Sequence, residues 1–361
     1  MDNHPYLSAR PFGFLPGGEA VEAWTLTSAG GLVVEALTYG GIVTRILAPD
    51  RDGHLADVVL GFNDLASYGA NSPYFGAITG RVAGRISAAK FELEGKTYKL
   101  AANNPPNHLH GGVRGFDKKI WAATRADNSD GAASLRLTYR SGDGEEGYPG
   151  TVDVTVTYTV TQDNQFLIET AAVTDRPTPF SLTNHSYFNL AGEASGTIDD
   201  HELQIHADQS VAVDEHMTLL GRLEPVTAGA NDFRQSRRLG EATPSLYQNH
   251  GDVYRLRKNA AAVENSELTP AARLFHPRSG RLIEVSTTES YLQFYTGSGL
   301  DGTLTGKSGV PYVRHAGVCL ECEGYADGAN APELGDIILR PGCPQQQATA
   351  YAFSAVALEA Q

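Results

Sequence analysis

The stretch Thr151–Val160, TVDVTVTYTV, alternates apolar and polar side chains from one residue to the next. Successive side chains of a β-strand point to opposite faces of the sheet, so one face of this segment is apolar and the other is polar. The apolar face consists of Val152, Val154, Val156, Tyr158 and Val160. The pattern predicts an antiparallel strand that is buried on one side.

The same two-residue period recurs along the whole chain. In SLRLTYR (134–140), Leu135, Leu137 and Tyr139 share one face, and FELEGKTYKL (91–100) is typical of a hairpin that turns near Glu94–Lys96. Helical periodicity is poor, and only short helices are expected, around residues 64–68 and 234–239. No linker, fixed-period repeat or change in composition divides the chain. We therefore predict an all-β protein, a large antiparallel β-sandwich with few short helices, as a single domain over residues 1–361.

Composition excludes several classes of function. The formal net charge of −14 repels nucleic acid and anionic membrane surfaces, so we expect no nucleic-acid or membrane partner but a neutral polar substrate. The N-terminus lacks the pattern of a signal peptide, and no apolar run approaches the ~18 residues of a membrane span, so a soluble cytoplasmic protein is expected. Three cysteines are too few for a disulfide framework, and buried reduced thiols are expected instead.

Four segments carry polar side chains that a strand-and-turn scaffold does not require. Each has an ordinary structural interpretation, such as a salt-bridged arginine, a hydrogen-bonded histidine or a solvated glutamate. Two histidines separated by one residue could also share a metal, and a Gly pair follows the second of them. The polar residues are Arg81 and Arg85, His108 and His110, His185, and Cys319 with Glu321.

Together these segments match a known family. NPPNHLHGGVRGFDKKIW (104–121), TNHSYFNLAG (183–192), LQFYTGSGLDGTLTGKSG (292–309) and CLECEGYADGANAP (319–332), followed by ILRPG (338–342), stand in this order and spacing. The chain thereby resembles the aldose 1-epimerase (galactose mutarotase) family over nearly its whole length, from about Leu26 to Pro341.

The resemblance implies a β-sandwich that binds a sugar in an open cleft. It also implies interconversion of the α and β anomers of a free aldose such as galactose or glucose, without cofactor or metal, by a monomer or a homodimer. By motif position, Glu321 resembles the family's catalytic base, His185 its catalytic acid and His110 its second catalytic histidine. The residues that resemble its ligands for sugar hydroxyls are Arg85, Asp252 and Gln293.

Two positions depart from the family pattern. Gly84 stands where many members have Asn, which removes one expected hydroxyl contact. Cys322-Glu323-Gly324 replaces the commoner Thr-Gln-aromatic and adds a second carboxylate beside Glu321. Both departures concern substrate preference rather than the reaction.

The implied chemistry explains why these residue types are needed. Ring opening removes the proton on O1 and delivers a proton to the ring oxygen, which a carboxylate and an imidazolium can do together. The reference pKa values of Glu and His are about 4.3 and 6.5, and mutual attraction of Glu321 and His185 is expected to favour both charged forms.

Three alternatives remain open at this point. The fold could serve a non-catalytic carbohydrate-binding module, since fold does not determine function. His108, His110 and a carboxylate could hold a metal for a hydrolase or isomerase. An epimerase acting on a sugar phosphate is the third alternative, although a phosphate requires more positive charge than Arg85 provides.

Overall fold

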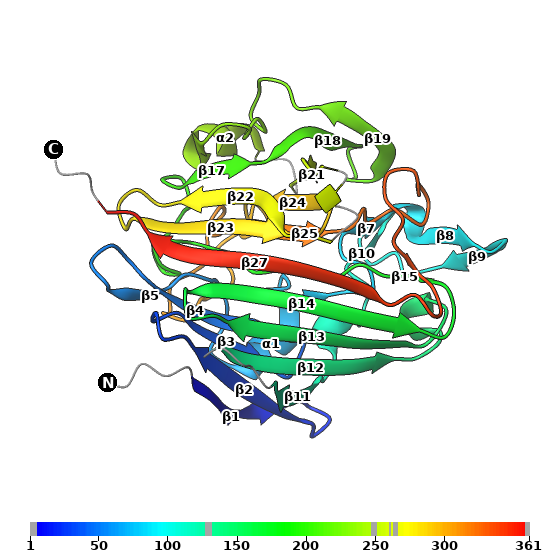
Figure 1. Cartoon of the computed structure of the whole chain (residues 1–361), viewed down its shortest axis with the longest axis horizontal. Helices are drawn as coiled ribbons and strands as arrows, with labels where there is room; N and C mark the ends of the chain where they lie inside the picture. Colours follow the sequence, from blue (N-terminus) through cyan, green and yellow to red (C-terminus); the bar gives the residue numbers. More distant parts are fainter. Residues whose placement is uncertain (1–5, 127–131, 247–250, 260, 263–265, 358–361) are drawn as a thin grey trace.

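The computed structural model describes residues 6–126, 132–246, 251–259, 261–262 and 266–357 (Figure 1). Strands account for most of the regular structure, and the ladders between named strands are antiparallel. The predicted all-β class with antiparallel sheets is therefore confirmed. The strands form three large sheets, and four short two-stranded pairs complete the fold.

The largest sheet has nine strands and spans the front of the molecule in Figure 1. The opening stretch of the sequence forms β13 near one side of it, and all five residues of its apolar face are at most 2% exposed. In spatial order the strands are β11 (Ala122–Arg125), β12 (Ala133–Ser141), β13 (Val152–Val160), β14 (Gln165–Thr174), β27 (Gln345–Ala355), β23 (Arg281–Thr287), β22 (Thr269–Phe275), β17 (Glu202–Ile205) and β20 (Arg237–Arg238).

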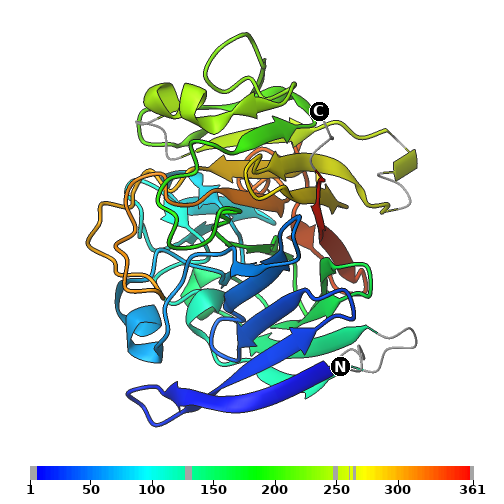
Figure 2. The ribbon, with the colours of Figure 1, turned by 90° about the vertical axis from the view of Figure 1, so that its left-hand side faces the viewer.

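Two five-stranded sheets lie behind the nine-stranded sheet. The first contains β1 (Tyr6–Phe14), β2 (Ala20–Thr27), β3 (Val33–Leu37), β4 (Val43–Pro49) and β5 (Leu55–Asp57). The second contains β19 (Leu219–Pro225), β18 (Ala207–Val213), β21 (Asp252–Leu256), β24 (Tyr291–Tyr295) and β25 (Cys319–Glu323). Figure 2 shows the blue strands of the first sheet below the orange strands of the second. All three sheets contribute buried side chains to one core, for example Leu26, Val154 and Leu320.

Short strand pairs and helices fill the space between the layers and their edges. The pairs are β6 (Ile78–Thr79) with β16 (Thr183–Asn184), β7 (Arg85–Ile86) with β10 (His108–Leu109), β8 (Lys90–Leu93) with β9 (Lys96–Lys99), and β15 (Thr178–Pro179) with β26 (Ile338–Leu339). The helices are α1 (Leu65–Asn71) and α2 (Leu239–Leu246), and the 3₁₀ turns are Ser87–Ala89, Phe116–Lys118 and Glu145–Gly147.

The predicted hairpin and one of the two predicted helices are confirmed, and the other predicted helix is wrong. The hairpin over residues 91–100 is confirmed, since β8 and β9 are joined by Glu94 and Gly95, both at positive φ. The helix near residue 64 is also confirmed, with the Asp64 side chain capping it. The helix expected over 234–239 is wrong, because Arg237 and Arg238 pair with β17 as a strand and the helix begins only at Leu239.

Gly76 fixes the segment that carries His185. Its N–H donates to the His185 carbonyl, and its own carbonyl accepts from Val43 N–H. Its φ is +66°, and a Cβ at this position would lie 2.0 Å from the Val43 carbonyl oxygen. Any side chain here must push two backbone segments apart, so the position requires glycine.

We predict that Gly76→Ala lowers the free energy of unfolding by about 2–4 kcal/mol, from a left-handed backbone plus overpacking. Gly53→Ala is the matched control, because Gly53 also has positive φ (+83°) but open space around its Cβ position. Gly53→Ala should lower the free energy of unfolding by only ~1 kcal/mol. Chemical denaturation of both variants measures the difference, and equal losses would contradict the steric argument.

Candidate active site

One cleft, with a volume of about 200 Å³, brings together five of the six predicted site residues. They come from three different strand pairs or their ends, and each is carried by a different stretch of sequence. Tyr74, Tyr187 and Tyr295 complete much of the wall. The predicted residues that line the cleft are Arg85, His110, His185, Gln293 and Glu321.

His185 follows β16 and is 4% exposed. Its ring is stacked against Tyr187 at 5.0 Å and against Tyr74 at 5.8 Å between centroids. Its Nε2 lies 3.5 Å from Glu321 Oε1, and its Nδ1 lies 3.6 Å from the Cys319 Sγ. The two tyrosine rings thus fix the plane of the imidazole and direct Nε2 at the carboxylate.

Glu321 lies in the middle of β25, 1% exposed. In the register of β24 and β25, Glu321 is directly opposite Gln293, and Cys319 is opposite Tyr295. Side chains of directly opposite residues lie on the same face, so these strands form the floor of the cleft. Glu321 Oε2 has no hydrogen-bond partner among the described residues. A buried carboxylate oxygen without a donor is costly unless a ligand supplies one.

Burial controls the charge of this pair. It lowers the pKa of His185 to about 3, and it raises the pKa of Glu321 well above its ordinary value, with the neighbouring Glu323 adding to the rise. The expectation that mutual attraction favours both charged forms is therefore wrong, because burial favours the neutral form of each group. Removal of each charged group from water costs more free energy than the attraction between His185 Nε2 and Glu321 Oε1 at 3.5 Å offsets.

His110 is held in one tautomer by the backbone. The N–H of Gly84 donates to His110 Nδ1 at 3.2 Å, so Nδ1 must carry a lone pair and the ring proton sits on Nε2. Burial, and then the neighbouring His185 and Arg85, hold the pKa of His110 well below its ordinary value. His110 is thus a neutral hydrogen-bond donor rather than a second imidazolium.

The three predicted hydroxyl ligands are placed differently. Arg85 lines the cleft and is held by a hydrogen bond from its Nε to Asn104 Oδ1 at 2.9 Å. Gln293 lines the cleft and donates to the Phe294 carbonyl at 3.0 Å. Asp252 is not among the residues that line the cleft. It lies on β21, its backbone carbonyl is 3.4 Å from Gln293 Nε2, and burial raises the pKa of its carboxyl to about 6.

Other polar residues that the sequence singled out lie elsewhere. Arg81 is 2% exposed and donates to Ser141, Gly142, Pro149 and Thr178, so it holds loops together. The His108 ring contacts the Ala101 carbonyl and the Tyr148 hydroxyl. The hypothesis of a metal held by His108 and His110 is therefore wrong. In the described part of the chain, two groups of side chains have possible metal-ligand atoms within 4.8 Å of one another. One is His110, His185 and Glu321, and the other is Asp50, Asp52 and His54.

Sequence reasoning missed Tyr74 and Asn104. Tyr74 packs edge-on against His110, at 4.7 Å between centroids, as well as stacking on His185. Asn104 orients Arg85. The Asn-rich turn before the two histidines was a usable signal for Asn104, whereas Tyr74 at φ +65° has no pattern that marks it.

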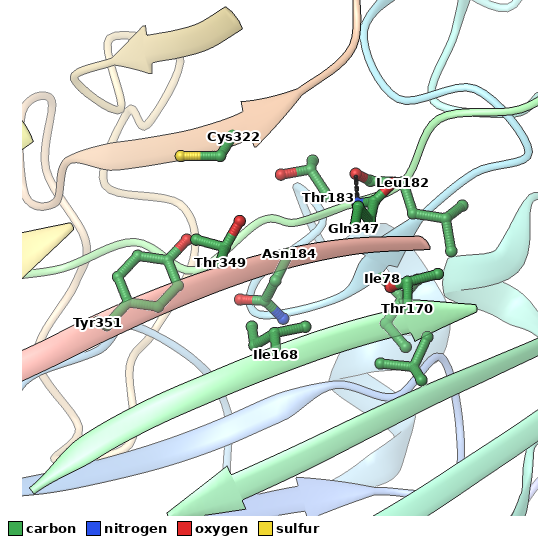
Figure 3. Close-up of a pocket in the computed structure, with 11 residues that line it drawn as sticks. Ile78, Ile168, Thr170, Leu182, Thr183, Asn184, Cys322, Gln347, Thr349 and Tyr351 are labelled. Carbon is green, nitrogen blue, oxygen red and sulfur yellow. Dashed lines mark hydrogen bonds between the residues drawn. The ribbon is translucent and has the colours of Figure 1, made fainter. Parts of the chain in front are cut away.

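A second, interior cavity lies between the nine-stranded sheet and the segments behind it (Figure 3). Its volume is about 20 Å³, room for roughly one water. Gln347, Thr349 and Cys322 line it, and Cys322 points away from the cleft because it alternates with Glu321 on β25. This cavity is a packing feature and carries no acid–base pair.

A buried carboxylate beside an imidazole, in a cleft of an antiparallel β-sandwich, defines an acid–base enzyme for a small polar substrate. The model of the family described as aldose 1-epimerase matches residues 22–352. The chain is 44% identical to galactose mutarotase of Homo sapiens over 95% of this chain and 97% of that protein. It is 32% identical to aldose 1-epimerase of Escherichia coli over 94% and 97%.

Solved structures agree with the sequence comparison. An aldose epimerase homologue from C. elegans superimposes with a TM-score of 0.83 at 27% identity, covering 97% of this chain and all of that one. Galactose 1-epimerase from Lactobacillus acidophilus gives 0.83 at 25% identity over 97% and 99%. The chain belongs to the aldose 1-epimerase family of isomerases.

The predicted fold, family and enzyme class are therefore confirmed. Cys319 and Cys322 are buried free thiols, as expected, and Cys343 is a free thiol at the surface. Within the described ranges, no helix has the length and apolar character needed to cross a bilayer.

We predict that the His185 imidazole stays neutral on acidification well below pH 6.5, because burial lowers its pKa to about 3. The nitrogen-15 shifts of its ring, assigned by loss of the signal in His185→Asn, measure this directly. At about pH 5 the ring should still give neutral-imidazole shifts. Titration near pH 6.5 would contradict the account of burial.

Proposed function

We propose that this chain interconverts the α and β anomers of a free aldose such as galactose or glucose, with Glu321 and His185 as the base and acid. The observation that carries the proposal is the otherwise unpartnered Oε2 of Glu321, buried beside the His185 ring in the same cleft. A sugar hydroxyl supplies the donor that this oxygen lacks.

Ring opening uses both groups. Glu321 takes the proton of the anomeric hydroxyl O1 while His185 delivers a proton to the ring oxygen, and the bond between C1 and the ring oxygen breaks to give the open aldehyde. O1 and the ring oxygen are both bonded to C1, so two groups 3.5 Å apart can reach one each. After rotation about C1–C2, the reverse transfers close the ring on the other face of the aldehyde. No net proton is gained or lost.

Burial favours the neutral form of both groups. A hydroxyl that donates a hydrogen bond to Glu321 favours the charged form of the carboxylate, which helps His185 to hold a proton. The reaction needs one proton on the pair, and the two transfers return it.

Other residues of the cleft orient the sugar. The Nε2–H of His110 is a donor for the ring oxygen or a neighbouring hydroxyl, and Arg85 and Gln293 bind further hydroxyls. We assign Asp252 the same task from the adjacent strand. Orientation by several fixed groups holds C1 between acid and base.

A sugar phosphate is a poorer fit to this cleft. Arg85 is the one cationic side chain among the described residues that line it, and Arg85 already faces the carboxylates of Glu321 and Glu323. A phosphate would add negative charge to a region that holds two buried acids.

We also propose that residues 1–361 act as one domain, because a single core draws on side chains from Leu7 to Phe353. The first and last few residues lie outside the described ranges.

Polarimetry of freshly dissolved α-glucose and α-galactose tests the proposed activity. The protein should accelerate the approach to anomeric equilibrium, and His185→Asn or Glu321→Gln should lower kcat by at least about 10²-fold with an unchanged melting temperature. His216→Asn and Glu284→Gln are matched controls, because both side chains are exposed and neither lines the cleft. They should retain full activity.

Three outcomes would overturn the proposal or one of its parts. A spontaneous rate that the wild-type protein leaves unchanged would indicate a sugar-binding module instead of an enzyme. Near-normal acceleration by either cleft variant would remove the proton-transfer role of that residue. Loss of activity in a chelator, restored by a divalent metal, would assign the His110, His185 and Glu321 group to a metal instead.

A further inference from the structure

The wall of the cleft behind Arg85 is thin. Gly84, Arg85 and Gln293 line the cleft on one side and also line a smaller cavity on the other. The smaller cavity has a volume of about 10 Å³, roughly the space of one water or one hydroxyl group. Glu323 also lines the smaller cavity.

Glu323 is a buried acceptor without a donor. It is 1% exposed, two residues after Glu321 on β25, and therefore on the same face of that strand. Its Oε2 forms no hydrogen bond with any residue that the structure describes. The acid–base steps proposed above do not use it. Keeping a carboxylate oxygen buried and unsatisfied is unfavourable, so a donor from outside the protein is expected.

Gly84 packs directly against this carboxyl group. A Cβ on Gly84 would lie 2.9 Å from Glu323 Oε1 and 2.7 Å from the Ala326 Cβ. A side chain at position 84 would therefore collide with Glu323 and Ala326. Glycine lets the backbone that lines the cleft approach the Glu323 carboxyl group closely.

The neighbouring charges favour a neutral donor. The charge of Arg85 acts on both Glu321 and Glu323, and its Nε is already bound by Asn104. Burial raises the pKa of Glu323 to about 8, so near pH 7 its carboxyl group is neutral and its carbonyl oxygen can accept a hydrogen bond. A sugar hydroxyl donates one hydrogen bond and brings no additional charge.

We propose that Glu323 is a specificity-determining residue, which accepts a hydrogen bond from one hydroxyl of the bound aldose beside Gly84. The inference rests on the proposed mutarotase function. The hydroxyl is not the anomeric one, because O1 is engaged by Glu321. Aldoses that lack this hydroxyl are then poorer substrates, since they leave the Glu323 carboxylate buried without a partner.

Glu323 also influences Glu321 through charge, as the largest electrostatic contribution at that residue after burial. An effect of this kind changes the reaction of every sugar by the same factor. A hydroxyl contact changes only the sugar that has the hydroxyl. The two are separated by combining the protein substitution with removal of single hydroxyls from the substrate.

The experiment measures kcat/KM for mutarotation of glucose and its 2-, 3-, 4- and 6-deoxy forms, with wild type, Glu323→Ala and Glu323→Gln. In wild type, kcat/KM for one deoxy sugar should be about 3–10-fold lower than for glucose, as expected for a hydrogen bond to a carboxyl group that is neutral near pH 7 because burial raises its pKa to about 8. For Glu323→Ala, kcat/KM on glucose should fall by a similar factor. On that deoxy sugar, kcat/KM of Glu323→Ala should equal that of wild type within about twofold. For the other deoxy sugars, the fold-loss in kcat/KM from the substitution and the fold-loss from the missing hydroxyl should multiply.

Controls keep the outcomes distinct. Glu284→Gln, an exposed carboxylate on β23, should leave the whole pattern unchanged. Glu323→Gln keeps a neutral acceptor and should retain a coupling similar to that of wild type. If Glu323→Ala fails to fold, Glu323→Leu provides the same comparison, because leucine cannot accept a hydrogen bond. If the fold-losses in kcat/KM from the substitution and from the missing hydroxyl multiply for all four deoxy sugars in a folded variant, the inference is overturned. Absence of activity of wild type on every aldose would instead overturn the proposed function.

Discussion

The His185 imidazole and the Glu321 carboxylate lie 3.5 Å apart where both are almost fully shielded from water. In such surroundings burial favours the neutral form of both groups, and the position of the proton that the pair exchanges with the sugar becomes the variable that the site controls. The surrounding structure holds the pair in place. Tyr74 and Tyr187 fix the imidazole plane, and the antiparallel register of β24 and β25 sets Glu321 opposite Gln293.

The site is assembled where short pairings meet the large sheets. β16 with β6 carries His185, β7 with β10 carries Arg85 and His110, and β24 with β25 carries Gln293 and Glu321. Two-residue strands have little stability of their own, so their geometry is set by close backbone contacts such as that of Gly76 with Val43. The same tight construction at Gly84 leaves the wall of the cleft thin in front of Glu323.

The sequence predicted the features that depend on the local order of residues, namely strand patterns and motif positions. The alternation in residues 151–160 predicted a half-buried strand, and spacing by family motif gathered Arg85, His110, His185, Gln293 and Glu321 in one cleft. The helix expected at 234–239 failed because pairing with β17 overrides local periodicity. The protonation of His185 was also mispredicted, because burial is a property of the folded chain and dominates the attraction of its neighbour. Tyr74 was missed because its role arises only from contact across the cleft.

The most direct test of the shared proton is the pH dependence of kcat/KM for mutarotation by the wild-type protein, since this quantity reports ionisations of the free enzyme. Activity requires one proton on the pair, and a second proton enters only when His185 is protonated. Because its pKa is lowered to about 3, kcat/KM should stay constant as pH falls through 6.5 and down to about pH 5. A decline in kcat/KM with an apparent pKa near 6.5 would show an ordinary histidine and contradict the account.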